Sequence, residues 1–145
     1  MTFIEEVNDL FNYEGKAWLA HCISSDFGMG KGIVVEFNKR YDLKNYMIKN
    51  YIRNNWNGKG YCIPAKDFKV FNLITKNKYS DKPTYETLKQ SLLHMRDYAT
   101  SLNVDTITMP IIGCGLDRLN YDIVKGIIKN IFNDTNITII VCKLE

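Results

Sequence analysis

The sequence predicts an α/β fold: a three-layer α/β/α sandwich built on a mixed, largely parallel, six-stranded sheet. Short β-type runs alternate along the chain with helical patterns, an order typical of sheets covered by helices on both faces. Several runs are apolar without alternation, as expected of strands buried on both faces. We expect the strands at residues 2–7, 17–23, 60–63, 69–74, 106–110 and 137–142.

Helical patterns lie between these strands. One is expected at residues 33–40, directly after a glycine cluster, and another at 43–52. The longest helix follows Thr84, a fitting N-cap, and Glu86 in its first turn complements the helix dipole. Its apolar face comprises Tyr85, Leu88, Leu92, Met95, Ala99 and Leu102. Asn120 is expected to cap the last helix, whose apolar side comprises Ile123, Val124, Ile127, Ile128, Ile131 and Phe132.

The composition is that of a globular protein. A length of 145 residues predicts a single domain spanning residues 1–145, and 46% hydrophobic with 24% charged residues is typical of a soluble chain. The net charge of +3 would favour an anionic small molecule but is too small to indicate nucleic-acid binding. No basic start precedes an apolar segment, and no apolar run approaches membrane-spanning length. We therefore expect a cytoplasmic protein with no membrane partner.

The cysteines indicate a reducing compartment. Cys22, Cys62, Cys114 and Cys142 lie far apart, form no Cys-x-x-Cys pair and have no histidine at zinc-ligand spacing, so no metal or cofactor is expected. Cys114 stands between two glycines and could be a thiol nucleophile, but no residue near it in sequence is placed to depress its pKa. We favour the interpretation that a small side chain here leaves the loop amides free.

The most informative motif runs from Met109 to Leu119, with the sequence MPIIGCGLDRL. An apolar strand leads into Gly113 and Gly115, and Asp117 follows. Ligands bind at the carboxyl ends of strands in open α/β sheets, and glycines let backbone N–H groups approach an anion such as phosphate. Because a carboxylate repels phosphate, we expect Asp117 to serve a sugar hydroxyl, a water or a developing positive charge. The alternative is a tight turn with Asp117 as a cap.

A second glycine cluster, GMGKG at residues 28–32, lies between a predicted strand and a predicted helix. This arrangement brings backbone donors and the positive end of a helix dipole together, where phosphate is the natural guest. The spacing fits neither a P-loop nor a dinucleotide fingerprint. Two such loops at two strand ends could grip the two phosphates of a diphosphate, although a flexible turn would explain either loop alone.

Lys76 completes the candidate site. It comes directly off a strand in the segment LITK, so a rigid element sets its origin. The polar loop that follows contains Lys78 and Lys82, where solvated lysines are common. His21 and His94 are expected to be hydrogen-bonded core or surface residues, and no Ser/His/Asp order emerges.

Taken in order, these motifs resemble those of a macrodomain, and within that superfamily the terminal ADP-ribose protein glycohydrolase branch. The resemblance covers nearly the whole chain. It is carried by residues 8–11 (NDLF), 20–24 (AHCIS), 29–33 (MGKGI), 73–76 (LITK), 82–85 (KPTY) and 113–119 (GCGLDRL). It implies hydrolysis of ADP-ribose that is linked through its distal ribose.

The resemblance also implies roles for single residues. The acid matching Asp9 binds the adenine amino group, the pair matching Lys76 and Asp117 carries the hydrolysis, and the glycine loops embrace the diphosphate and distal ribose. Cys142 stands where the resemblance implies an aromatic residue. The implied ligand-binding set is Asp9, Leu10, His21, Ser24, Met29, Gly30, Gly32, Ile33, Thr75, Ile112, Gly113, Cys114, Gly115 and Leu116.

The expected substrate is ADP-ribose joined through its distal anomeric carbon to an acidic side chain, an acyl group or a nucleobase. Cleavage builds positive charge on the ribose, so a fixed carboxylate there, Asp117, would stabilise the transition state more than the ground state. A deprotonated Lys76 could act as a Schiff-base nucleophile on the opened sugar. A protonated Lys76 could instead position Asp117 or polarise the leaving group, and the sequence leaves both roles open.

Two other functions fit the resemblance. Some macrodomains bind ADP-ribose or a related nucleotide without turnover, and others remove the terminal phosphate of ADP-ribose 1″-phosphate. The presence of both Lys76 and Asp117 favours the hydrolase, because a binding module has no need of the pair. The expected partner is ADP-ribose, or ADP-ribosylated protein or nucleic acid, and the protein is expected to be a monomer.

Overall fold

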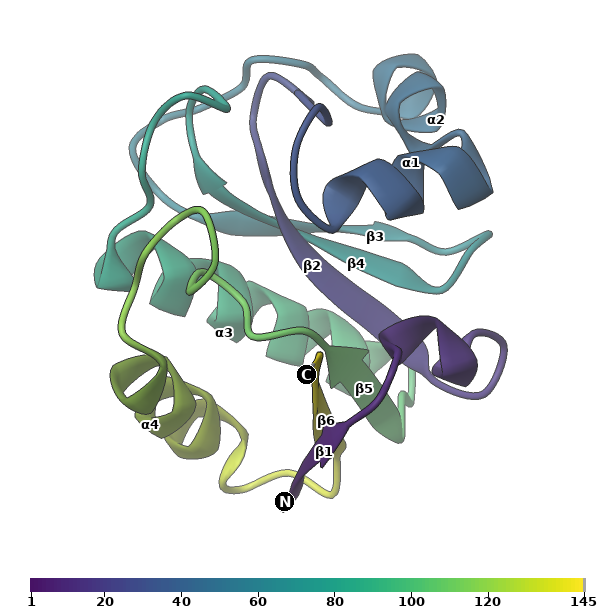
Figure 1. The fold of residues 1–145 in the computed structure, drawn as a ribbon, viewed down its shortest axis with the longest axis vertical. Coiled ribbons are helices and arrows are strands. Elements are labelled where there is room, and N and C mark those ends of the chain that lie inside the picture. Colours follow the sequence, from purple (N-terminus) through teal and green to yellow (C-terminus); the bar gives the residue numbers. More distant parts are fainter. Residues whose placement is uncertain (145) are drawn as a thin grey trace.

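A computed structural model describes residues 1–144 and contains one six-stranded sheet with helices on both faces (Figure 1). The predicted fold class is confirmed. The strands are β1 (Thr2–Val7), β2 (Trp18–Ser24), β3 (Tyr61–Ala65), β4 (Val70–Lys76), β5 (Thr106–Met109) and β6 (Thr138–Lys143). The helices are the 3₁₀ helix η1 (Leu10–Tyr13) and α1 (Val34–Tyr41), α2 (Leu43–Asn50), α3 (Tyr85–Ser101) and α4 (Tyr121–Phe132).

The strand order is β1-β6-β5-β2-β4-β3. Every neighbouring pair is parallel except β3 and β4, which are antiparallel. Residues 66–69 are too few for the crossover that a parallel pair requires, so these two strands form a hairpin at the edge. The five parallel strands consequently deliver their carboxyl ends to one edge of the sheet.

The helices form two layers with separate cores (Figure 1). On one face, α3 and α4 pack on the sheet through Leu88, Leu92, Met95, Val124, Ile128 and Phe132. On the other face, η1, α1 and α2 pack through Leu10, Phe11, Val34, Phe37, Leu43 and Met47. No helix within residues 1–144 combines the length and the hydropathy that membrane crossing requires.

The predicted caps are confirmed. The Thr84 side chain accepts a hydrogen bond from the Thr87 amide, and the Thr87 hydroxyl accepts one from the Thr84 amide, so α3 begins with a reciprocal capping box. Asn120 accepts from the Ile123 amide at the start of α4. Most strand and helix ends lie within one or two residues of the predicted ones; α2, for example, ends at Asn50 rather than residue 52. The 3₁₀ helix η1 was not predicted.

The chain opens a cleft where β2 and β5 separate. Register pairs join these strands only at Trp18–Ile107 and Leu19–Thr108, whereas β2 pairs with β4 along nearly its whole length. After β2 the chain enters α1 on one face, and after β5 it enters α4 on the other (Figure 1). Crevices at such reversals of strand connection are where open α/β sheets bind ligands.

Candidate functional site

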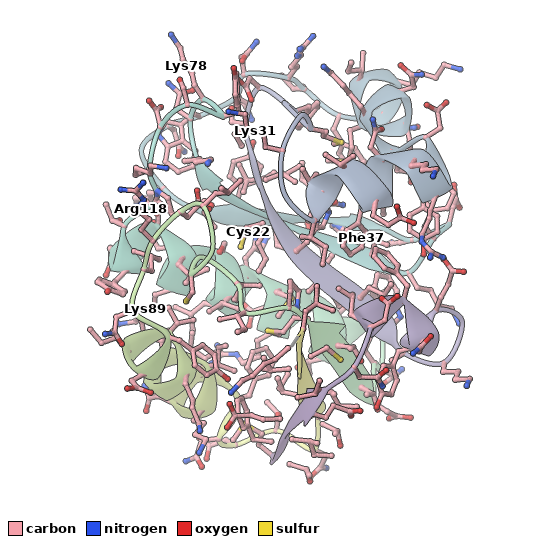
Figure 2. All side chains as sticks on the ribbon, in the orientation of Figure 1. Cys22, Lys31, Phe37, Lys78, Lys89 and Arg118 are labelled. Atoms are coloured by element: carbon pink, nitrogen blue, oxygen red, sulfur yellow. The ribbon has the colours of Figure 1, made fainter. Side chains whose placement is uncertain are left out.

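The cleft at this edge has a volume of about 1230 Å³. Its walls come from the carboxyl ends of β2, β4 and β6, from the segment after β1 and from both glycine loops. Lys31 in the first loop, Arg118 beside the second and Cys22 on β2, all labelled in Figure 2, are among its lining residues. Segments that are far apart in the sequence thus form one site.

Lys76 and Asp117 form an ion pair in this cleft. Lys76 Nζ donates to Asp117 Oδ1 at 2.8 Å, and the two side chains are only 13% and 16% exposed. Lys76 is the last residue of β4, so the sheet fixes its backbone. Cys22 also lines the cleft, and burial together with the charge of Asp117 raises the pKa of its thiol. The thiol therefore stays protonated beside the pair.

The first glycine loop connects β2 to α1 and presents backbone N–H groups. Gly32 adopts a φ of +80°, and Ile33, the N-cap residue of α1, makes no side-chain capping bond. Within residues 1–144, the amides of Gly30 and Lys31 donate to no acceptor, and both residues line the cleft. Uncapped donors at a helix N-terminus are suited to an anion.

The second glycine loop faces the cleft from the β5 side. Gly113 is buried with a φ of +71°, and its carbonyl accepts from the Leu119 amide at 2.7 Å, which closes the loop. The amides of Gly115 and Leu116 donate to no group in the described part of the chain, and both residues line the cleft. The two glycine loops therefore present unpaired backbone amides to one cavity, as predicted, and each loop is called a backbone cradle below.

Asp9 and Leu10 also line the cleft, together with Phe11 and Cys142. Asp9 Oδ1 caps η1 by accepting from the Phe11 amide at 3.0 Å, which leaves Oδ2 available to a ligand. The Phe11 ring is covered by Arg40, whose Cζ lies 4.3 Å from the ring centroid. Arg40 also lines the cleft, and the sequence analysis did not single it out.

Comparisons with known proteins agree with this architecture. No protein-family model matches the chain. The macrodomain of Thermus aquaticus DarG superposes with a TM-score of 0.79 and 19% identity, covering 97% of each chain. Thermosipho africanus DarTG in complex with ADP-ribose gives a TM-score of 0.74 and 17% identity over 99% of this chain and 42% of that one. At these identities the likeness establishes the fold.

The relatives of higher identity establish the family. The human and bovine proteins named ADP-ribose glycohydrolase OARD1 are each 38% identical to this chain over 136 residues, which cover 94% of this chain and 88% of the relative. The chain is a macrodomain of the terminal ADP-ribose glycohydrolase branch. The family resemblance in the sequence is thereby confirmed.

Ten of the fourteen implied ligand-binding residues of this macrodomain line the cleft, and four do not. Those that do are Asp9, Leu10, Ser24, Gly30, Gly32, Ile33, Ile112, Gly113, Gly115 and Leu116. The other four are His21, Met29, Thr75 and Cys114. Their contacts explain why the structure gives them no place in the cleft wall.

His21 and Thr75 belong to the protein interior. His21 is fully buried, stacks on Phe37 with ring centroids 3.9 Å apart, and has Nε2 at 2.7 Å from Asn72 Oδ1. Side chains alternate along a strand, so the parity of His21 on β2 directs its ring under α1. Thr75, beside Lys76 on β4, is 1% exposed.

Met29 and Cys114 belong to the two glycine loops, and their side chains contact the protein rather than the cleft. Met29 is buried in the core beneath α1 and α2, which anchors the middle of the first loop. The Cys114 thiol donates to the Ile112 carbonyl at 3.2 Å, and burial raises its pKa. A partly buried thiol with a raised pKa is a poor nucleophile, so the structure favours the small-side-chain interpretation of Cys114.

Asp26 is a second residue of this region that the sequence analysis did not single out. Its Oδ1 accepts from the Ser24 hydroxyl at 2.5 Å and from the Gly28 amide at 3.0 Å. Ser24 lines the cleft, and because its proton is donated to Asp26, it offers lone pairs to a ligand. The available signal was an acid placed directly before a glycine loop, where an Asx turn is common.

Proposed function

We propose that this macrodomain is an ADP-ribosyl hydrolase, which binds ADP-ribose and cleaves its distal C1″ linkage to an acidic side chain, an acyl group or a nucleobase. The observation that carries the proposal is the Lys76–Asp117 ion pair between two backbone cradles in one cleft. The name of the relatives at 38% identity, ADP-ribose glycohydrolase, supports the same activity. The name of the Thermosipho africanus structure, a complex with ADP-ribose, supports the ligand.

The cleft is suited to a nucleotide that carries a diphosphate. Its two glycine loops supply unpaired amides, and the positive end of α1 points to the same space. Asp9, which also lines the cleft, has one carboxylate oxygen available to accept from an adenine amino group. A ligand that spans from Asp9 to the glycine loops would place its distal ribose beside Lys76 and Asp117.

Asp117 supplies electrostatic stabilisation at the anomeric carbon. As the bond from C1″ to the linked group breaks, the ribose ring gains positive charge, and the partly buried carboxylate favours that charge more than the neutral ground state. Lys76 holds the carboxylate in place through the 2.8 Å contact. In this role Lys76 acts as an ammonium.

A covalent role for Lys76 requires a proton transfer first. The ammonium gives a proton to Asp117 Oδ1, the acceptor in contact with it, and the free amine then forms a bond to C1″ while the linked group leaves with its bonding electrons. Water then attacks C1″ and the bond from C1″ to Lys76 Nζ breaks. This step frees ADP-ribose and regenerates the lysine side chain. The ring-opened form of this adduct is an imine, which gives the covalent route a chemical signature.

Two rivals share this cleft, a binding module without turnover and an ADP-ribose 1″-phosphatase. The deciding experiment offers three substrates separately: protein ADP-ribosylated on glutamate, ADP-ribosylated DNA and ADP-ribose 1″-phosphate. Release of ADP-ribose from the first or second supports the proposal. Phosphate release from the third alone identifies a phosphatase, and binding of ADP-ribose without release from any substrate identifies a binding module.

We further propose that the protein acts as a monomer in a reducing cytoplasm. One chain supplies the ion pair and both glycine loops, which supports a site that needs no second subunit. The cysteines Cys22, Cys62, Cys114 and Cys142 are free thiols in the structure, which is compatible with that location. Sedimentation velocity and cell fractionation test the two statements.

A further inference from the structure

The loop between β4 and α3, residues 77–84, is bonded to both sides of the cleft. The Tyr79 amide donates to Asp26 Oδ2 at 3.1 Å, and Lys82 Nζ donates to the Leu116 carbonyl at 2.8 Å. Asp26 lies just before the first glycine loop, whereas Leu116 belongs to the second. This loop therefore connects the two cradles to each other.

The carboxylate of Asp26 divides its bonds between two segments. Oδ1 binds the Ser24 hydroxyl and the Gly28 amide within its own loop, while Oδ2 binds the Tyr79 amide, 53 positions later in the sequence. Burial acts to raise the pKa of Asp26, but these hydrogen bonds outweigh it and hold the pKa below its ordinary value. The carboxylate is accordingly ionised at neutral pH, and bonds to it are charge-assisted.

Steric contact reinforces the same junction. A Cβ atom built on Gly28 would lie 2.9 Å from Tyr79 Cβ, so the two loops touch where Gly28 has no side chain. Next to it, the Ser25 amide donates to the Lys76 carbonyl at 2.9 Å. The start of the first glycine loop and the end of β4 thus meet through a hydrogen bond on each side of a close contact.

We propose that Asp26 is a positioning residue that fixes the first glycine loop relative to Lys76. This inference rests on the proposed function, in which that loop holds the diphosphate and Lys76 acts at C1″. Tyr79 lies three residues after Lys76, so holding the Tyr79 amide sets the loop against the strand end that carries the amine. A misplacement of about 1 Å can lower a rate about a hundredfold, so the coupling acts on kcat more than on affinity.

The test is the substitution Asp26→Asn. The amide keeps an oxygen for Ser24 and Gly28 but turns an NH₂ donor toward the Tyr79 N–H, so it breaks the bond between the loops and preserves those within its own loop. Asp81→Asn is the matched control. Asp81 is an exposed acid in the 77–84 loop whose Oδ2 accepts only from the Lys78 amide, at 3.0 Å, so the control removes the same charge without touching the junction.

Three quantities are measured for each variant: kcat and KM on ADP-ribosylated protein, the dissociation constant of ADP-ribose by calorimetry, and exchange of the Tyr79 amide by NMR. We expect Asp26→Asn to lower kcat about tenfold or more, to change ADP-ribose affinity by less than about threefold, and to accelerate exchange at Tyr79. Asp81→Asn should leave kcat and affinity unchanged. A purely structural role of Asp26 would lower the melting temperature without this separation of kcat from affinity.

A wild-type kcat in Asp26→Asn, or a loss confined to affinity, overturns the proposal. So does rapid exchange of the Tyr79 amide in the wild-type protein, a measurement that needs no variant to fold. If the wild-type protein releases no ADP-ribose from any substrate, the proposed function fails. The junction is then still decided by whether Asp26→Asn exposes the Tyr79 amide while Asp81→Asn does not.

Discussion

Lys76 Nζ lies 2.8 Å from Asp117 Oδ1, although 41 positions separate the two residues in the sequence. The lysine ends an interior strand of the sheet, β4, and Asp117 lies in the second glycine loop, which the bond between the Leu119 amide and the Gly113 carbonyl closes. A rigid strand and a closed turn thus place a cation and an anion together at low exposure. Their separation from solvent makes each charge depend on the other.

Removing either member of the pair should abolish turnover and spare binding. Lys76→Ala and Asp117→Ala are each expected to lower kcat on ADP-ribosylated protein about a hundredfold or more, because both act on charge that develops only in the transition state. ADP-ribose affinity, measured by calorimetry, should stay near wild type, since the loop amides hold the diphosphate. Lys78→Ala, an exposed lysine that does not line the cleft, is the control and should leave turnover unchanged. Wild-type turnover in Lys76→Ala or in Asp117→Ala would contradict the assigned roles.

The covalent route makes a separate prediction. If Lys76 forms the imine, borohydride added during turnover should reduce it and leave a stable adduct on Lys76, visible by intact mass and peptide mapping. Lys76→Ala should give no adduct, and Lys78→Ala should give the wild-type amount. Active enzyme that is never trapped would instead assign Lys76 to holding Asp117 as an ammonium.

The sequence predicted most of the fold because the local signals agreed with the packing. Each buried strand was an apolar run, and each predicted cap, Thr84 and Asn120, had the side chain that the first turn requires. The 3₁₀ helix η1 was not predicted because its four residues are too few for a periodic pattern. What fixes it is Asp9, which accepts from the Phe11 amide.

The sequence predicted those parts of the candidate site that lie in contiguous motifs. The resemblance identified the ion pair and both loops, since each lies in a contiguous block. It could not resolve which side chains inside a block reach the cleft, and strand parity turned His21 toward Phe37. The bond from Tyr79 to Asp26 joins residues outside every block and depends on how two loops meet, which sequence patterns do not encode.

Adding a methyl group to the second glycine loop should destabilise the protein at Gly113 but not at Gly115. At Gly113, with a φ of +71°, an added Cβ would lie 3.0 Å from Leu119 Cδ1, so Gly113→Ala should lower the free energy of unfolding by about 1–3 kcal/mol. A Cβ on Gly115 would meet nothing within 4 Å, and Gly115→Ala should be close to neutral. Urea unfolding of the two variants tests this contrast. Equal stabilities would show that the loop relaxes without cost.

His21 is the basis of a predicted pH dependence of stability. Burial lowers its pKa from 6.5 to about 4, and the hydrogen bond to Asn72 only partly opposes that shift. Between these values the unfolded chain binds a proton on His21 and the folded chain does not. By linkage, the stabilising effect of keeping His21 neutral is fully present above pH 6.5 and is lost as the pH falls toward 4.

The loss of unfolding free energy at low pH follows from how far the pKa of His21 is lowered. A difference of this size corresponds to roughly 3 kcal/mol of unfolding free energy lost across the window, and the His21→Gln variant should lack that loss. Urea denaturation of both proteins at several pH values from 7.5 to about 4.5 measures it, and the carboxylates and His94 cancel because both proteins contain them. The two stability curves should converge as the pH falls. Parallel curves would mean that His21 keeps an ordinary pKa, which is incompatible with a fully buried ring stacked on Phe37.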